Sequence, residues 1–443
     1  MDALKRWGWI AGLLALGAAP ARGLDLVEAH RLALAHDPAF ARARAELDAV
    51  RYQRRQAVAR LLPSLEARAE RIRNRDEVSA PGVQFITEGE ASYYSSEYAL
   101  DLRQAVFAPA ELARLRAATY RLRAARARFD AARQDLIRRV VDAYLGLLAA
   151  RDGLALARAE RRAVARQLEL AEARLAVGLG TVTDRHEARA RHLLAEAAVV
   201  EATNRLADRR GALVEIIGRA PEGLRPVDPD HRPLAPDPDR AAAWLARAEA
   251  AHPELRAARL EADAARWALW AARGGHLPSL DLVASRRRVE ADGSLSGPGL
   301  TRDNTDLGLE LRLPLLAGGG VLARAGEARA RWRAARQRLE QTRREVRRRV
   351  EAAFRDLAGS IRRATALAAA VAAAESALAG KREGFEAGTE SNIDVLNAQR
   401  EWFRARRDHL EARYAYLRHR VGLRRAAGVL SARDVETLNA WLE

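Results

Sequence analysis

The sequence contains no cysteine, so it can form no disulfide, no thiolate metal site and no acylated N-terminal cysteine as a lipid anchor. Aromatic residues make up only 5% of its 443 residues. Alanine, arginine, leucine and glutamate dominate instead, which is typical of long helices rather than of a β-sandwich. Long apolar runs are also missing after the N-terminus: the brief one at 366–374 ends at Glu375, whereas a spanning helix needs about 20 residues.

The first 23 residues are predicted to be a cleaved signal peptide. Lys5 and Arg6 form a short positive region, residues 7–19 are apolar, and small residues allow cleavage after Ala21 or Gly23. With no later membrane-spanning helix expected, this pattern predicts an exported protein.

Arginine provides almost all of the formal charge of +17. The arginines alternate with glutamates at three- and four-residue spacings, which favours a solvated, ion-paired helix surface over a nucleic-acid-binding one. The densest basic run, residues 343–349, is the observation that most favours the alternative, an arginine-rich protein that binds polyanions. The sequence does not explain why arginine is so abundant.

No pattern of catalytic or metal-binding residues is present. The nine histidines include no pair at a spacing of three or four residues, which argues against a helical metal site. There is no GxxxxGK[ST] phosphate loop and no nucleophile elbow, and the three glycines at 318–320 indicate a strand-to-helix turn. We therefore expect neither an enzyme nor a protein with a metal or cofactor.

The most informative positive feature is an internal repeat. Residues 36–65 match residues 251–280 at a constant offset of 215, and Gly178 recurs as Gly388 at an offset of 210. A unit of a little over 200 residues is too long for a solenoid repeat, so it indicates two halves of one architecture.

Proline marks the limits of two long helices. None occurs between Pro109 and Pro221 or after Pro314, and the helical pattern runs over 110–177 and 321–387. At about 1.5 Å per residue each helix would be a rod of roughly 100 Å, which must pack laterally on other helices.

Shorter helices are predicted beside each rod. In the first half, one runs from Asp25 to Leu62 and another returns from the turn to about Gly218. Two half-length helices placed end to end would match one rod, which suggests a barrel wall of uniform height.

Between the short helices and the rods the apolar period changes to two. Leu65, Ala67 and Ala69 alternate with charged residues in the first half, as do Leu307 and Leu309 in the second. Such strands fit a transmembrane β-barrel with a polar lumen, although a hairpin lying on a soluble core would show the same alternation. Four strands cannot close a barrel around water, but twelve from three chains could.

The predicted organisation follows from these patterns. It comprises a signal peptide (1–23), a first repeat (24–220, with a β-hairpin at 64–107), a proline-rich equatorial linker (221–238), a second repeat (239–430, with a β-hairpin at 279–316) and a C-terminal tail (431–443).

Over essentially its whole mature length the chain resembles the TolC family of outer-membrane channel proteins. The residues that carry the resemblance are the duplicated Pro…Leu-Pro-Ser-Leu blocks at 38–65 and 253–280, the turn from Gly178 to Asp184, the segment from Gly388 to Gln399, and Leu313-Pro314-Leu315 before the three glycines. Their order, spacing and duplication make the match specific.

The resemblance implies a mainly α-helical fold with transmembrane β-structure: a homotrimer in which a twelve-stranded β-barrel in outer-membrane lipid continues into a long α-helical barrel across the periplasm. It further implies a periplasmic adaptor and an inner-membrane pump of the ABC, RND or MFS type, while nucleic acid is not an expected partner. The loops at 74–91 and 287–304 would face outside.

The resemblance also identifies candidate residues at the periplasmic tip. Its expected constriction and adaptor contacts correspond here to Asp394, Asp184, Thr183, Glu390 and Asn397, and to the turn residues Gly178, Gly180, Gly388 and Thr389. Asn397 stands where the family has a second acidic residue, Glu390 replaces a basic one and Phe385 an aromatic hydroxyl. What holds the tip closed therefore stays open, with Arg185 or Arg382 as candidate substitutes.

Two further interpretations remain at this stage. Asp184 and Asp394 could simply be first-turn carboxylates that stabilise helix N-termini, and Asp184 has capping-box spacing to Glu187. The whole chain could instead be a periplasmic coiled-coil adaptor or scaffold, although such a protein would need no amphipathic hairpins.

Overall fold

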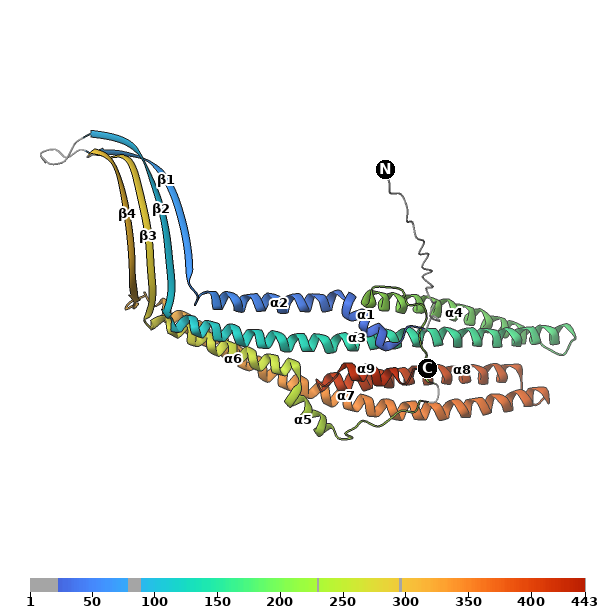
Figure 1. The fold of residues 1–443 in the computed structure, drawn as a ribbon. Helices are drawn as coiled ribbons and strands as arrows, with labels where there is room; N and C mark the ends of the chain where they lie inside the picture. The colour runs from blue at the N-terminus through green and yellow to red at the C-terminus, as the bar shows by residue number, and fades with distance from the viewer. Residues whose placement is uncertain (1–22, 79–88, 229–230, 295–296, 443) are drawn as a thin grey trace, which may run out of the picture.

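The structure is a computed structural model that describes residues 23–78, 89–228, 231–294 and 297–442. The predicted signal peptide, apart from Gly23, lies outside the described residues. A long helical body carries a curved four-stranded sheet at one end (Figure 1).

The two halves of the chain have the same order of elements. The first half comprises α1 (Leu26–His36), α2 (Pro38–Ala59), β1 (Ser64–Val78), β2 (Gly89–Phe107), α3 (Pro109–Ala176) and α4 (Val182–Ile217). The second half comprises α5 (Ala241–Ala251), α6 (Pro253–Arg273), the 3₁₀ turn η1 (Gly274–His276), β3 (Ser279–Ser294), β4 (Gly297–Arg312), α7 (Gly320–Glu386) and α8 (Asn392–Ala426), followed by α9 (Ala432–Asn439).

The two predicted rods are confirmed as α3, with 68 residues, and α7, with 67. Helices α2 and α4 lie end to end along α3, and α6 and α8 lie in the same way along α7 (Figure 1). Each rod is thus accompanied by two half-length helices, as the length comparison predicts.

The predicted single helix from Asp25 to Leu62 is wrong, because the chain breaks at Asp37 between α1 and α2. Pro38 disfavours a helical conformation in the residue before it, and Asp37 is extended, with its carboxylate accepting the N–H of Phe40 at 2.8 Å. In the second half, His252 occupies the same position before Pro253. The X-Pro pairs of the repeated blocks are therefore helix breaks.

The returning helices α4 and α8 end next to glycines that pack against these breaks. Gly218 and Gly428 have left-handed backbone conformations, with φ of 77° and 72°. A Cβ on Gly428 would lie 2.6 Å from the Cα of His252, and one on Gly218 would lie 2.9 Å from the Cβ of His36. Both the conformation and the close approach require glycine at each position.

The hydrophobic core lies near the middle of the helical body, where the half-length helices meet the rods. It includes Ala29 of α1, Leu136, Val140 and Tyr144 of α3, Val350 and Leu357 of α7, and Tyr416 and Leu417 of α8. The segment predicted as a C-terminal tail contains α9, which contributes the buried residues Val435 and Leu438 to this core. The Tyr144 hydroxyl donates to the carbonyl of Leu24 at 2.9 Å and so ties the N-terminal segment to it.

Ion pairs confirm the expectation of a charge-paired helix surface. In the basic run at 343–349, Arg343 and Arg344 pair with Glu340, at 3.2 and 2.9 Å. Arg347 lies 3.6 Å from Glu249 of α5, and Arg349 pairs with a carboxylate of α6. This run therefore binds α7 to its neighbours rather than forming an isolated basic patch.

The sheet is antiparallel in the order β1-β2-β3-β4. Its strands are longer than expected, because pairing continues through nearly all of the predicted loop at 287–304, as far as Ser294 opposite Gly297. In the predicted loop at 74–91 it continues as far as Val78 opposite Gly89, and residues 79–88 lie outside the described residues. The resemblance implied loops here, but charged residues of these segments find partners within the sheet, such as Arg75 with Glu90.

The two faces of the sheet differ as the alternation predicts. On one face Leu65 lies opposite Leu102 and Leu282 lies opposite Leu309. Leucines of β4 on this face are largely exposed, at 76, 65 and 68% for Leu307, Leu309 and Leu311. On the other face the guanidinium of Arg103 bridges Asp281 and Glu310, at 3.0 and 2.8 Å.

One helix in the described part of the chain is apolar enough to be compared with a membrane span. Within α7 an 18-residue window reaches a mean hydropathy of 1.2, with 17% of it buried. By composition, the expectation that no stretch after the signal peptide is apolar enough to span a membrane is therefore wrong. A single window in an alanine-rich rod of 67 residues is weak support for a span.

Candidate functional site at the helical tip

The turns that join α3 to α4 and α7 to α8 lie together at the end of the helical body opposite the sheet (Figure 1). Ala171 of α3, Ala188 of α4 and Leu396 of α8 form a small buried cluster just behind them. The structure therefore brings both predicted tip segments into one site.

Glycine ends both rods. Gly178 and Gly388 have φ of 75° and 78°, a backbone region that favours glycine. After Gly178, the N–H of Leu179 donates to the carbonyl of Arg174 at 2.8 Å, which satisfies an otherwise free C-terminal carbonyl. Thr389, exposed at the second turn, donates its hydroxyl to the carbonyl of Gly384 at 3.0 Å.

Both tip aspartates are the third helical residue of a capping box. Asp184 accepts the N–H of Thr181 at 3.2 Å and donates its own N–H to the Thr181 hydroxyl at 3.0 Å. Asp394 exchanges the corresponding bonds with Ser391, at 3.1 and 3.2 Å. The capping-box partner of Asp184 is therefore Thr181, and the predicted box with Glu187 is wrong because the helix begins one turn earlier than that pairing requires.

The capping bonds favour the charged form of Asp394. The Ser391 hydroxyl and backbone N–H lower the pKa of this carboxyl, and nearby Lys381 lowers it further. The stabilising role at a helix N-terminus is thus present in the structure, and it leaves a negative charge at the tip.

Sequence reasoning missed Lys381, which pairs with Glu390 at 2.7 Å across the second turn. The hydrogen bond to Glu390 raises the pKa of Lys381. Gly384 makes room for this pair, because a Cβ there would lie 2.6 Å from the Cγ of Glu390. A signal was available: Lys381 is the only lysine after Lys5 in a chain otherwise rich in arginine.

Side-chain amides connect the two hairpins of the tip within one chain. Asn397 of α8 accepts a hydrogen bond from Arg191 of α4 at 2.9 Å. Gln167 of α3 donates to the side-chain oxygen of Asn392 on α8 at 2.5 Å. Asn397 therefore uses its oxygen for an internal link between the repeats, a contact that distant sequence positions could not reveal.

An aromatic contact adds a further link. The guanidinium of Arg174 lies 4.4 Å from the ring centre of Phe385, so a cation–π contact joins the two rod ends. Within the described residues neither Arg185 nor Arg382 forms an ion pair, and Thr183 is exposed. In the same part of the chain no group of three or more His, Asp or Glu side chains could hold a metal ion.

Comparison with known proteins bears directly on this architecture. A sequence model of the family described as outer membrane efflux protein matches residues 29–219 and again residues 244–429. The chain belongs to the outer membrane efflux protein family. The double match coincides with the two halves seen in the fold.

Individual relatives cover nearly the whole chain. The outer membrane protein TolC of Vibrio cholerae is 31% identical over 95% of this chain and 94% of its own length. The alkaline protease secretion protein AprF of Pseudomonas aeruginosa is 32% identical over 99% and 92%. The proteases secretion protein PrtF of Dickeya chrysanthemi is 30% identical over 97% and 94%.

Solved channels share the fold at lower identity. The outer membrane channel CmeC of Campylobacter jejuni superposes with a TM-score of 0.79 at 16% identity, over 94% of this chain and 90% of its own. The outer-membrane channel OprN gives 0.78 at 22% identity, over 91% and 90%. Family membership and fold make this chain an outer-membrane channel protein of efflux or type I secretion, and these relatives do not support the adaptor or scaffold alternative.

Proposed function

We propose that three copies of the chain form a passive exit duct across the outer membrane and periplasm. The observation that carries this proposal is the four-stranded sheet, which is apolar on one face and leaves an edge of β1 and an edge of β4 unpaired in the described chain. Open strand edges are not tolerated in lipid, so copies must pair edge to edge.

The need for a lumen supports three copies. Two copies would give eight strands, and the interior of an eight-stranded barrel is just wide enough for side chains to fill. Three copies give twelve strands and leave a duct. The apolar face would then contact lipid, and the face with Arg103, Asp281 and Glu310 would line the lumen.

We propose the tip as the constriction. A threefold axis would place three copies each of Asp394 and Asp184 near one another, and such rings of carboxylates attract cations. Glu390 is partly neutralised by Lys381. Thr183 lies in the first turn of α4 and Asn397 in the second turn of α8. The turn residues Gly178, Gly180, Gly388 and Thr389 are at the extreme end, where a periplasmic adaptor could reach them.

Energy would come from an inner-membrane pump of the ABC, RND or MFS type, joined to the tip by the adaptor. AprF and PrtF are named for protease secretion, and each is at least 30% identical over nearly the whole chain. This similarity supports a secreted protein as the cargo.

The proposal predicts the state of the purified protein. It should extract from the outer membrane as a trimer and conduct ions in a planar bilayer. A mature protein that fractionates as a soluble monomer, or a trimer with no conductance, would contradict it.

The tip assignment has its own test, Asp394→Asn, which removes the charge but can keep the capping geometry. It should lower cation selectivity and weaken block by multivalent cations. Ser391→Ala is the matched control, because it removes the capping hydroxyl while the carboxylate stays. If selectivity is unchanged in Asp394→Asn, Asp394 does not line the constriction.

A further inference from the structure

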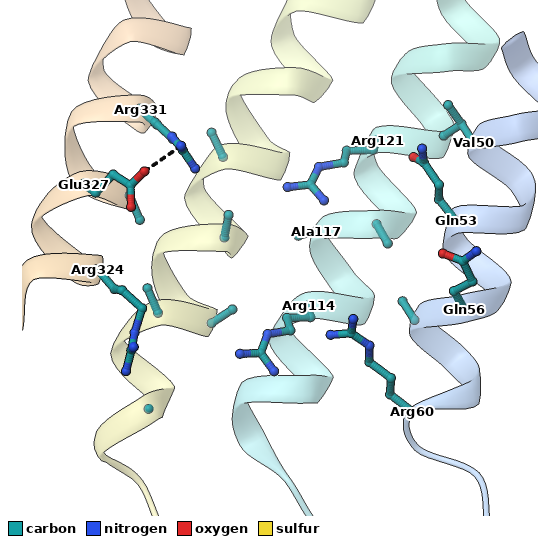
Figure 2. A pocket seen from close by; sticks show the side chains of 18 residues that line it. Val50, Gln53, Gln56, Arg60, Arg114, Ala117, Arg121, Arg324, Glu327 and Arg331 are labelled. Carbon is teal, nitrogen blue, oxygen red and sulfur yellow. Dashed lines mark ion pairs between the residues drawn. The ribbon is translucent and has the colours of Figure 1, made fainter. Parts of the chain in front are cut away.

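A large basic hollow lies at the sheet end of the helical body. Figure 2 shows the side chains that line it. It has a volume of about 1010 Å³ and is lined by α2, α3, α6 and α7. Its floor consists of alanines, including Ala117 and Ala268, and its charged lining residues are Arg60, Arg114, Arg121, Arg324, Glu327 and Arg331. Figure 2 shows Arg114 and Arg121 pointing from α3, and Arg331 from α7, toward the helix α6 between them.

The arginines of this hollow are only partly neutralised by their neighbours. Arg331 pairs with Glu327 at 2.5 Å, and Arg60 and Arg114 share one carboxylate, Glu111 of α3. Arg121 and Arg324 are exposed and form no ion pair with any residue that the structure describes. Five guanidinium groups therefore face two carboxylates, which is a local excess of positive charge.

Continuity with the sheet shows on which side of the wall the hollow opens. A second hollow, at the junction of helices and strands, shares Arg60 and Gly275 with the first. It is lined by Arg103, Asp281 and Arg312, which are on the polar face of the sheet. In the proposed trimer the opposite face contacts lipid, so the basic hollow faces the lumen; this step rests on the proposed function.

We propose that this hollow, repeated three times around the lumen, binds the carboxylate groups of an acidic polypeptide as it passes through the duct. Guanidinium groups match carboxylates in a two-point geometry, and the unpaired Arg121 and Arg324 are free to do so. Gln53 and Gln56 on the same rim offer amide groups to a peptide backbone. We call the three hollows together the collar. The collar favours anionic protein cargo, whereas the tip at the other end of the helical body attracts cations.

The lining argues against a nucleic acid as the occupant. Channels that bind single-stranded nucleic acid combine basic groups with aromatic side chains on which bases stack. Among the residues that the structure describes, none that lines this hollow is aromatic, and its floor is alanine. An acidic polypeptide needs only the charges and the amides.

The test measures block of the trimer current by short poly-L-glutamate added on the barrel side. The variant Arg121→Gln with Arg324→Gln removes two positive charges per chain. We expect its half-blocking concentration to rise by about tenfold, equivalent to ~1.4 kcal/mol. Block of the unmodified trimer should also weaken as salt rises from about 0.1 M to about 1 M, because the screening length falls from ~10 to ~3 Å.

The matched control is Arg126→Gln with Arg329→Gln. These exposed arginines are five residues further along the same two helices and do not line the hollow. The control should block like the unmodified trimer. If block weakens equally in the control, or does not weaken in the first variant, the proposed collar is wrong. The proposed conducting trimer would be unaffected by either result.

Two other outcomes are decisive. A purified protein that does not conduct at all would contradict the proposed function itself. An oligonucleotide of equal charge that blocks more tightly than poly-L-glutamate would overturn the assignment to acidic polypeptide.

Discussion

The two halves of the chain build the same helix break with different side chains. At the first break Asp37 caps α2 and also binds Arg139 of α3 through two hydrogen bonds, at 2.7 and 2.9 Å. At the second break His252 caps α6, accepting the N–H of Glu254 at 3.2 Å. Duplication has kept the backbone plan and let the chemistry diverge.

The carboxylate of the second half is two residues further on. Glu254 pairs with Arg349 of α7 at 2.7 Å and with Arg425 of α8 at 2.9 Å. Arg349 follows Arg139 at the same offset of 210 that relates the tips. In both rods an arginine at the equivalent position therefore pairs with a carboxylate at the start of the neighbouring short helix. The carboxylate is the residue before the proline in the first half and the residue after it in the second.

These differences produce different pH responses. The hydrogen bonds from Arg139 lower the pKa of Asp37. Burial raises the pKa of Glu254, but the hydrogen bonds from Arg349 and Arg425 outweigh it and lower the pKa to about 2. Burial lowers the pKa of His252 to about 4. Only the second half therefore contains a break that becomes less stable at mildly acidic pH.

The largest expected effect comes from the glycines that pack on the breaks. Gly428→Ala should lower the free energy of unfolding by about 4 kcal/mol, because it combines a left-handed alanine with overpacking against backbone. Gly218→Ala should cost less, since its Cβ would meet a side-chain atom of His36. Thermal unfolding of the solubilised trimer, followed by circular dichroism, measures both. Equal losses would show that the two contacts are equivalent.

Removing the ion pair of the first break should have the next largest effect. Asp37→Ala leaves Arg139 without its main partner and removes a cap, at a cost of about 3 kcal/mol. Asp37→Asn should lose less, because asparagine is an equally good cap. Both variants remove the charge, so the difference between their losses of stability measures the contribution of the cap alone. If both lose the same stability, the cap contributes nothing.

The third prediction concerns acid sensitivity. Because the folded-state pKa of His252 is about 4 against an unfolded value of 6.5, the unfolded chain binds the extra proton first as the pH falls. Stability is then lost below about pH 6.5, by about 2 kcal/mol between pH 7.5 and pH 5. His252→Asn should keep the cap and flatten this part of the pH profile. The carboxylates Asp37 and Glu254 contribute fully in this range and lose their contribution only at lower pH. An unchanged profile in the variant would exclude His252 as the cause.

The smallest effects are expected at the tips. Thr181→Ala and Ser391→Ala should each cost about 1 kcal/mol locally through the loss of a cap. Lys381→Met should additionally loosen the second tip, whereas the first has no corresponding ion pair in the part of the chain that the structure describes. Hydrogen exchange of the turn amides separates the tips. If Lys381→Met accelerates exchange at the first tip and leaves exchange at the second tip unchanged, the result is inconsistent with the Lys381–Glu390 pair.

Much of the fold was accessible from the sequence, for a physical reason. Helical and strand periods are local properties, so the rods, the hairpins and the amphipathic sheet follow from residue order. The extension of β3 and β4 through 287–304 was not accessible, because charged strand residues become acceptable only when the neighbouring strand supplies partners, as Glu97 of β2 does for Arg287.

At the tip, too, the sequence located the residues but not the contacts between them. The residues at its turns and the glycines before them could be located by alignment of the two halves. That Asp184 pairs with Thr181 depends on where the helix begins, and that Asn397 meets Arg191 depends on how the two hairpins pack. The Thr181–Asp184 spacing matches the capping-box pattern, although the pairing was assigned one turn too late, whereas the Asn397–Arg191 contact has no sequence signature. The isolated lysine was a signal, and the structure shows its partner.

Residue order alone established the duplicated plan, the length of the rods and the alternation of the strands, because each depends on neighbours along the chain. Tertiary structure decided which carboxylate meets Arg139 or Arg349 and how four helices gather arginines from residue 60 to residue 331 around one hollow. Such groups are brought together only by lateral packing of helices far apart in sequence, and electrostatic interactions between them depend on that distance.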